Sequence, residues 1–141
     1  MTSQLNPYLN FNGNAREAME FYQSVFGGEL ALNTFGDLHA SEDPAEFDKV
    51  MHAQLETPSG YLFMGSDTPN HMEYEPGVNN FSVSISGDAD SEDELSGYFS
   101  KLGEGGEVLQ PLAAAPWGAS FGMLKDRFGI TWLVNIAAPA A

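Results

Sequence analysis

The sequence predicts an α+β fold in which a βαβββ unit occurs twice within a single domain. Three observations predict it. Two segments carry apolar residues at helical spacing, the segments around them alternate apolar and polar residues, and each half of the chain ends in a hairpin pattern. These features occur in the same order in both halves. Such a duplication constrains the fold more strongly than any single motif in the chain.

The first module is expected over about residues 5–67 and opens with a short strand at residues 8–11. Alternating residues predict a further strand at 29–35 and a hairpin of two strands within 51–66. Residues 36–48 are acidic and contain a proline, so we expect a mobile solvated loop there rather than a lid over a binding site.

A helix is predicted directly after the first strand. Asn14 is a suitable N-cap, and Glu17 three residues later completes a capping-box pattern. Gly27 and Gly28 should end the helix. Its buried face is expected to contain Ala15, Ala18, Met19, Tyr22, Val25 and Phe26, which follow helical spacing.

The second module is expected over about residues 78–137, after a connector at 68–77 that is rich in turn-forming residues. Residues 80–86 alternate apolar residues with asparagine and serine, as a half-buried strand does. A short strand is predicted at 107–110, followed by a proline- and alanine-rich crossing at 111–116.

The helix of the second module repeats the pattern of the first. Ser91 and Glu94 form a second capping box, and Gly103 should end the helix. Its apolar face is predicted to contain Leu95, Tyr98, Phe99 and Leu102. The clearest hairpin signal in the chain comes last, at residues 121–135, with its turn at Asp126 to Gly129.

Composition excludes several classes of function. The chain of 141 residues has a formal net charge of −15 and only five basic residues, so we expect neither nucleic acid nor an anionic membrane as a partner. The absence of cysteine excludes disulfides, thiolate nucleophiles and iron–sulfur clusters. No signal peptide or membrane-spanning run is recognisable, and we expect a soluble cytoplasmic protein.

Several segments in this order resemble the vicinal oxygen chelate superfamily, which has the glyoxalase/bleomycin-resistance/dioxygenase fold, and in particular its PhnB-like branch. They are Pro7-Tyr-Leu-Asn-Phe-Asn-Gly-Asn-Ala-Arg-Glu-Ala-Met-Glu-Phe-Tyr22, Phe26-Gly-Gly28, Val50-Met-His-Ala53, Trp117-Gly118 and Asp126-Arg-Phe-Gly-Ile-Thr-Trp132. The resemblance implies a glyoxalase-like fold with curled mixed sheets that enclose a cleft. It also implies a homodimer.

Enzymes of the superfamily often bind a divalent metal through four side chains, one from the first and one from the last strand of each module. The resemblance places these positions at Asn6 or Pro7, Met64, Asn80 and Leu133. Leucine offers no donor atom, and a methionine thioether is a poor ligand for a hard cation. We therefore expect no metal at these positions and predict no cofactor.

The cleft of such a fold should be lined by the sheet faces opposite the helices. Met51, Ala53 and Leu55 are expected beneath the first helix, which leaves Val50 and the predicted binding residues on the other face. The predicted substrate-binding residues are His52, Gln54, Glu56, Trp117, Phe121 and Met123, with Lys125 in a matching place. Apolar area with a few polar groups is typical of a small-molecule site.

His52 is the best candidate for a catalytic residue, because a histidine can transfer protons near neutral pH. The alternative is a structural histidine paired with Glu56 on the same strand, and Glu56 is itself a possible general base. His39 and His71 lie in acidic loops and are expected to be solvated. A non-standard metal site from His39, Asp43, His52, Asp67 and His71 matches no known ligand spacing. Tyr61, Phe63 and Trp132 are expected in the core.

Three functions remain open at this point. The favoured one is a metal-independent protein that binds a small organic molecule, with no reaction assigned. The alternatives are an enzyme, either a lyase or isomerase using His52 or a metal-dependent dioxygenase or glyoxalase, and a drug-sequestering resistance protein. PhnB-like sequences are sometimes labelled methyltransferases, but the chain has no glycine-rich GxGxxG segment to hold S-adenosylmethionine, no phosphate-binding loop and no nucleophile elbow.

Overall fold

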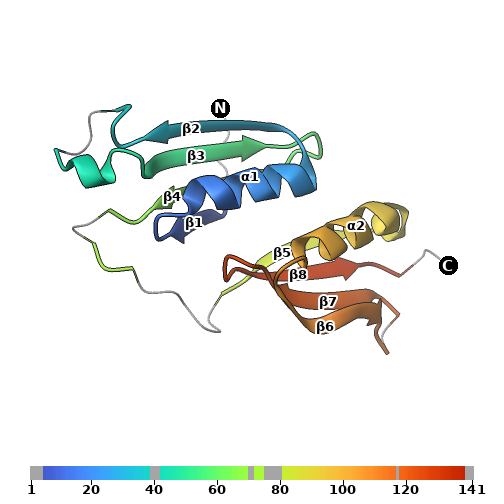
Figure 1. The fold of residues 1–141 in the computed structure, drawn as a ribbon. Coiled ribbons are helices and arrows are strands. Elements are labelled where there is room, and N and C mark those ends of the chain that lie inside the picture. Colours follow the sequence, from blue (N-terminus) through green and yellow to red (C-terminus); the bar gives the residue numbers. More distant parts are fainter. Residues whose placement is uncertain (1–4, 39–41, 70–71, 75–80, 117, 139–141) are drawn as a thin grey trace. The chain divides into compact units, whose positions relative to one another are not determined.

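The computed structural model describes residues 5–38, 42–69, 72–74, 81–116 and 118–138. The chain divides into two compact units, Met1–Glu75 and Pro76–Ala141. Each unit has one four-stranded mixed sheet with one α-helix across one of its faces (Figure 1). The βαβββ order occurs in both units, which confirms the predicted duplicated α+β fold.

The first unit has its strands in the spatial order β1-β4-β3-β2, with β1 parallel to β4 and the other pairs antiparallel. Its elements are β1 (Tyr8–Phe11), α1 (Ala15–Phe26), β2 (Glu29–Thr34), a 3₁₀ turn (Pro44–Glu46), β3 (Val50–Glu56) and β4 (Leu62–Asp67). The predicted strands and hairpin of this module are therefore present.

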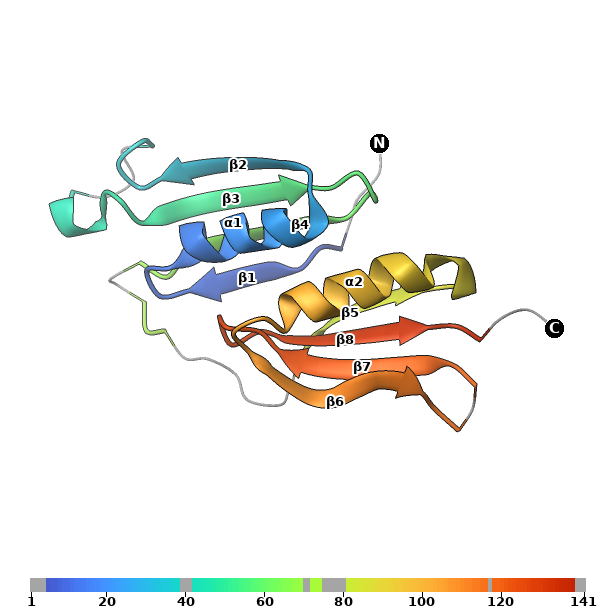
Figure 2. The ribbon, with the colours of Figure 1, turned by 45° about the vertical axis from the view of Figure 1, so that its right-hand side comes forward.

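Helix α1 covers β2, β3 and β4 (Figure 2). All six residues predicted for its apolar face are buried. Its aromatic side chains meet those of the hairpin edge-on: Tyr22 and Phe26 both contact Phe63 at about 5.6 and 5.7 Å between ring centroids, and Phe26 also contacts Tyr61. Phe63 is buried, as predicted, and such pairs add roughly 0.5–1.5 kcal/mol each beyond the burial of apolar area.

The capping box predicted at the start of α1 is wrong, because Asn14 makes no side-chain capping bond. Asp67, at the end of β4, takes this role. Its Oδ1 accepts hydrogen bonds from the amides of Gly13 (2.8 Å) and Ala15 (2.9 Å), and its Oδ2 accepts one from the amide of Val50 (2.8 Å). One buried carboxylate therefore ties the start of α1 and the start of β3 to the end of β4.

The described start of the loop after β2 is hydrogen-bonded to the end of the same loop and to Thr34 of β2. The amides of Phe35 and Gly36 donate to the carbonyls of Lys49 and Phe47. Thr34 and Asp37 form a reciprocal pair, in which each backbone amide donates to the other side chain. The hydrogen bonds that the backbone amide and then the side chain of Thr34 make to the Asp37 carboxyl group lower the pKa of Asp37, because they favour its ionised form.

The second unit repeats this topology with the strand order β5-β8-β7-β6 and a parallel β5–β8 pair. Its elements are β5 (Val83–Gly87), a 3₁₀ turn (Ala89–Ser91), α2 (Glu92–Leu102), β6 (Glu107–Ala114), β7 (Ser120–Lys125) and β8 (Thr131–Ile136). The hairpin predicted at residues 121–135 corresponds to β7 and β8.

Two strand predictions in this unit need correction. The strand predicted at 80–86 begins only at Val83, and Phe81, one of its alternating apolar residues, is 63% exposed. The predicted crossing at 111–116 is largely part of β6, which continues to Ala114. Pro111 is tolerated because β6 is the edge strand, where the missing amide breaks no ladder, and the register of β6 shifts on both sides of Gln110.

Helix α2 packs mainly against β5, β8 and β7. Leu95, Phe99 and Leu102 are buried as predicted, whereas Tyr98 is only half-buried. The Tyr98 hydroxyl donates to Glu94 Oε1 (2.7 Å), and the Ser91 hydroxyl donates to Asp88 rather than capping the helix. The second predicted capping box is therefore also wrong.

Asp126 organises the turn of the last hairpin. Its Oδ1 accepts from the amides of Phe128 (2.8 Å) and Ile130 (3.0 Å), and its Oδ2 accepts from the indole of Trp132 (2.8 Å). Trp132 is buried, as predicted, beneath α2 with Val134. The conspicuous Asp126–Trp132 segment is thus a structural feature of the hairpin.

Among the described residues, no helix has the length and apolar character needed to cross a bilayer.

Candidate functional site

Each sheet has one face beneath its helix and one open face, and the alternation along the strands assigns residues to them. In β3, Ala53 and Leu55 are fully buried under α1. His52, Gln54 and Glu56 lie on the open face, as predicted, and are half-buried or exposed. Three of the predicted binding residues therefore share one surface.

The prediction for the first two residues of β3 is wrong. Val50, expected on the open face, is 1% exposed, and Met51, expected beneath the helix, is 39% exposed. The cause is a register shift in the pairing with β2: Asn33 pairs with His52, but Thr34 pairs with Val50. Met51 is thus an extra residue in the ladder, and alternation fails at such a bulge.

His52 lies close to Tyr8 across the open face. The Tyr8 hydroxyl is 3.5 Å from His52 Nδ1, at the long limit of a hydrogen bond, and the ring centroids are 6.0 Å apart. Glu56, the partner considered for a structural histidine, accepts a hydrogen bond from Gln54 Nε2 (3.1 Å) instead. Tyr8 is therefore the polar neighbour of the predicted catalytic candidate.

The residues around His52 form a continuous row across the sheet. Tyr8 pairs with Met64 on the neighbouring strand, Met64 pairs with Gln54, and Gln54 pairs with Ala31. The row combines an aromatic ring, a flexible apolar side chain and an amide, and His52 lies beside it. Such a surface offers apolar area for affinity and a few polar groups for orientation.

Two other predicted binding residues lie on the open face of the second sheet. Phe121 and Met123 are half-buried on β7, opposite Gly122 and Leu124, which are buried on the α2 side. Lys125 continues this face and is exposed. The remaining predicted binding residue, Trp117, lies outside the described residues.

Two of the positions that the family resemblance assigns to metal ligands are not suited to a metal here. Met64 lies on the open face of β4 in register with Tyr8, and Leu133 lies on the open face of β8 in register with Ser84. A thioether and an aliphatic side chain at these places do not fit a divalent cation. Asn80 lies outside the described residues.

The non-standard metal site has no support in the described part of the chain. Asp67 is buried and bound to three backbone amides, and Asp43 caps the 3₁₀ turn through the amide of Ala45. His39 and His71 lie outside the described residues. Among the described residues no three His, Cys, Asp or Glu side chains come together in a group that could hold a metal ion.

Two features of the structure were not predicted as functional. The first is Tyr8, and its signal was available, because alternation with Leu9 and Phe11 places it on the open face. The second is a groove in the second unit between α2 and β6. It depends on how the helix lies over the sheet, which the sequence pattern does not show.

The fold is that of glyoxalase-like proteins. A glyoxylase/bleomycin resistance protein/dioxygenase domain from Frankia sp. EAN1pec superimposes with a TM-score of 0.62, over 100% of this chain and 96% of that domain. The two sequences are only 12% identical, so the likeness concerns the fold alone.

More similar sequences define the family. Residues 3–135 match the family described as 3-demethylubiquinone-9 3-methyltransferase, and the chain belongs to this PhnB-like family. Protein PA1353 from Pseudomonas aeruginosa is 43% identical, with a TM-score of 0.82 over 98% of this chain and 100% of that one. A putative 3-demethylubiquinone-9 3-methyltransferase, PhnB protein, from Bacillus cereus is 28% identical, with a TM-score of 0.70 over 96% and 100% of the two chains.

The family description names a methyl transfer, and the turn between β1 and α1 is not free to hold its usual donor, S-adenosylmethionine. A nucleotide-type cofactor is commonly held by free backbone amides where a strand turns into a helix. Between β1 and α1 this turn is Asn12-Gly13-Asn14, and the amides of Gly13 and Ala15 already donate to Asp67. An internal carboxylate thus occupies the place that a phosphate or carboxylate of a cofactor would take.

Proposed function

We propose that this protein binds a small organic molecule on the open face of its first sheet, around His52 and Tyr8. The binding requires no metal at the positions that metal-dependent relatives use. The observation that carries this proposal is the composition of the row Tyr8–Met64–Gln54 beside His52: apolar area is combined with hydrogen-bonding groups, and Met64 brings only a thioether to the place where the family resemblance implies a metal ligand.

A chemical reaction at the same place is the second candidate. It is favoured by the contact between the Tyr8 hydroxyl and His52 Nδ1. If Nδ1 accepts this hydrogen bond, the proton of the neutral ring resides on Nε2, and Nε2 is the atom that could transfer a proton to a bound ligand. The corresponding reaction class is a lyase or an isomerase with His52 as acid or base.

The proposed functional form is a homodimer, as the family resemblance implies. Light scattering on the purified protein tests this directly. A mass twice that of the chain supports the dimer, and a mass equal to one chain contradicts it.

The binding proposal is tested by two measurements on the same preparation. Metal analysis of protein purified without chelator is expected to give far less than one equivalent. A thermal-shift screen of small organic acids, amines and phenols is expected to find compounds that stabilise the fold, since a ligand at about 100 times its Kd adds about 2.7 kcal/mol to the free energy of unfolding.

The decisive comparison uses variants of the first unit. His52→Ala should keep the melting temperature of the free protein and lose the stabilisation by the ligand. Tyr8→Phe should reduce the binding of the ligand less than His52→Ala does. Glu20→Ala, on the exposed face of α1, should leave the binding of the ligand unchanged. One equivalent of tightly bound metal, or a His52→Ala variant that unfolds without ligand, would show that the proposal is wrong.

For the second candidate, His52 is tested by product formation and its pH dependence with a compound found in the screen. A lyase or isomerase should lose at least about a hundredfold in rate in His52→Ala, as is typical of an acid–base residue. A compound that binds but is recovered unchanged contradicts catalysis and leaves the binding proposal intact.

A further inference from the structure

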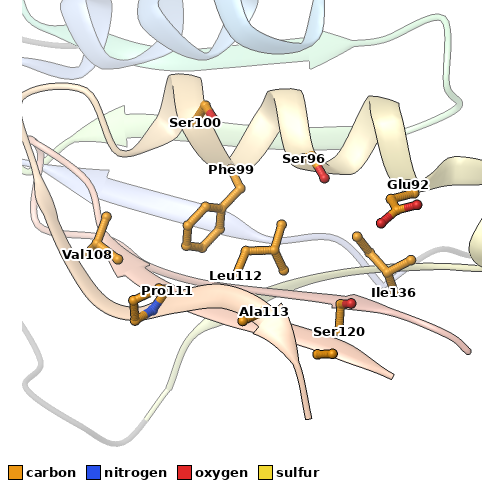
Figure 3. A pocket seen from close by; sticks show the side chains of 11 residues that line it. Glu92, Ser96, Phe99, Ser100, Val108, Pro111, Leu112, Ala113, Ser120 and Ile136 are labelled. Atoms are coloured by element: carbon orange, nitrogen blue, oxygen red, sulfur yellow. The ribbon is translucent and has the colours of Figure 1, made fainter. Parts of the chain in front are cut away.

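A groove of about 630 Å³ lies in the second unit, on the helix side of its sheet (Figure 3). Its walls are one flank of α2 and the edge strand β6. It is lined by Glu92, Ser96, Phe99, Ser100, Leu112 and Ile136, among others. The volume is in the range of sites for small organic molecules, which is roughly 300–1,000 Å³.

The groove results from the different coverage of the two sheets. Helix α1 packs against its edge strand β2, whereas α2 makes its main contacts with β5, β8 and β7. Leu112 of β6 points towards α2 across the uncovered part of the sheet (Figure 3). A Cβ on Gly122 would lie 2.7 Å from Phe99 and 2.9 Å from Leu112, so this glycine allows the two residues to close the apolar floor.

The polar groups of the groove have one electrostatic character. Glu92 lies at one end and is the only charged residue among the described residues of the lining, which include three serine hydroxyls and no basic side chain. Glu92, Asp93 and Glu94 together form the first turn of α2. Three carboxylates outweigh the roughly half positive charge that a helix dipole contributes at its start. The end of the groove at Glu92 is therefore favourable for a cation.

We propose that this groove binds an amphipathic organic cation, with an aliphatic or aromatic body over Phe99, Leu112 and Ile136 and an ammonium group at Glu92. The serine hydroxyls along α2, at Ser96 and Ser100, accept hydrogen bonds from an ammonium or a polar substituent. Apolar burial supplies the affinity, and Glu92 selects the charge.

This site is separate from the one proposed around His52. Its residues belong to the second unit and to the helix side of the sheet, while His52 and Tyr8 belong to the open face of the first sheet. The two proposals therefore succeed or fail independently.

The test uses three probes with the same alkyl chain: decylammonium, decanol and decanoate. Binding is followed at low ionic strength by the NMR shifts of the Leu112 and Ile136 methyl groups. We expect decylammonium to bind about tenfold more tightly than decanoate, with the affinity of decanol between them. This difference corresponds to a modest attraction of Glu92 for the ammonium and a modest repulsion of the carboxylate.

Two pairs of variants locate the site. Glu92→Gln should weaken the binding of decylammonium about threefold to tenfold and leave the binding of decanol unchanged. Asp93→Asn lies in the same turn but outside the lining, so it should change the affinity for decylammonium by less than about twofold. Ser96→Phe should fill the groove and remove binding of all three probes, while Ser24→Phe on the exposed face of α1 should not. His52→Ala should change none of these affinities.

Several outcomes would overturn the proposal. Equal losses in Glu92→Gln and Asp93→Asn would show only general attraction to an acidic protein. Equal affinity for decylammonium and decanoate would exclude selection by Glu92. If the wild-type protein is a dimer that Ser96→Phe converts to a monomer, a second copy covers the groove. Far-UV circular dichroism of each variant confirms that the fold is retained, and Glu92→Gln, at an exposed position, decides the question if Ser96→Phe is unfolded.

Discussion

The two units share one topology, and each contains a buried aspartate whose carboxylate accepts several hydrogen bonds, but the two aspartates occupy different places in the topology. In the first unit Asp67 joins the last strand to backbone amides 52 and 54 residues earlier and to one 17 residues earlier. In the second unit Asp126 binds groups only two, four and six residues ahead of it. The first carboxylate connects three elements, and the second shapes one hairpin.

The comparison shows that a duplicated chain order does not require duplicated interactions. The helix of the first unit covers its edge strand, whereas that of the second leaves the groove beside β6. Both helices lack the predicted side-chain cap, but Asp67 replaces it only in the first unit. In the second unit, the edge of the sheet at β6 is therefore less covered by its helix than the corresponding edge at β2 in the first unit.

The largest expected effect comes from removing the two aspartates. Asp67→Ala leaves three amide donors without their carboxylate, and we expect it to lower the free energy of unfolding by about 4 kcal/mol. Asp126→Ala should cost about 3 kcal/mol, because two of its partner amides are only part-buried. Urea denaturation followed by circular dichroism measures both.

The tryptophans make this comparison specific, because Trp117 and Trp132 both belong to the second unit. The midpoint of urea denaturation followed by tryptophan fluorescence should therefore fall strongly in Asp126→Ala. Asp43→Ala is the control: it removes an exposed capping hydrogen bond from the 3₁₀ turn and should cost about 1 kcal/mol or less. If Asp67→Ala lowers the free energy of unfolding by as little as Asp43→Ala does, the role assigned to the Asp67 carboxylate is wrong.

Effects equal to or smaller than that of Asp126→Ala are expected from the glycines that lead into β2 and β6. A Cβ on Gly28 would lie 2.0 Å from the Glu56 carbonyl oxygen, and the residue has a φ of +99°. Gly28→Ala should cost about 3 kcal/mol, from collision and left-handed strain together. Gly106→Ala, with a contact of 2.3 Å to the Lys125 carbonyl but no positive φ, should cost about 2 kcal/mol.

Gly60 provides the control for these two glycine variants. Its φ is +86°, but nothing lies within 4 Å of an added Cβ, so Gly60→Ala should cost only about 1 kcal/mol. Thermal melts of the three variants should therefore rank Gly28, Gly106 and Gly60. A Gly60→Ala variant as unstable as Gly28→Ala would show that backbone strain, not close approach, dominates at these turns.

The smallest expected effect has the opposite sign. Gly97 lies on the exposed face of α2 with open space around it, so Gly97→Ala should stabilise the second unit by about 0.5–1 kcal/mol through helix propensity. Gly13→Ala has equally open space but a φ of +91° and should destabilise the first unit. The tryptophan melting midpoint reports the gain, and a decrease would contradict it.

Much of the fold could be predicted because its signals are local. The apolar faces of both helices, the glycines after them and both hairpins follow from spacing within ten or twelve residues. The predicted capping boxes failed because Asn14 and Ser91 have suitable chemistry, while the actual partners are Asp67, far along the chain, and Asp88, which competes for the serine hydroxyl. The competition from Asp67 is long-range and has no sequence signature, whereas Asp88 lies only three residues from Ser91.

The candidate site was partly predictable for the same reason. Alternation placed His52, Gln54 and Glu56 on one face correctly, and it failed at Val50 and Met51, where a bulge interrupts the ladder. The proximity of Tyr8 to His52 required knowledge that β4 lies between β1 and β3, since the contact spans 44 residues of sequence. The length of β6 was missed because proline and alanine normally indicate a break, which an edge strand tolerates.

The carboxylate of Asp67 also has a consequence for the order of folding. During synthesis, the first turn of α1 has no anchor until residue 67 has been added, whereas the contacts of Asp126 close within one hairpin. Contacts between residues distant in sequence tend to form late in folding. We therefore expect the second unit to nucleate at its hairpin and the hydrogen bonds of Asp67 in the first unit to form only after the folding transition state. In stopped-flow experiments Asp126→Ala should then mainly slow refolding, and Asp67→Ala should mainly accelerate unfolding.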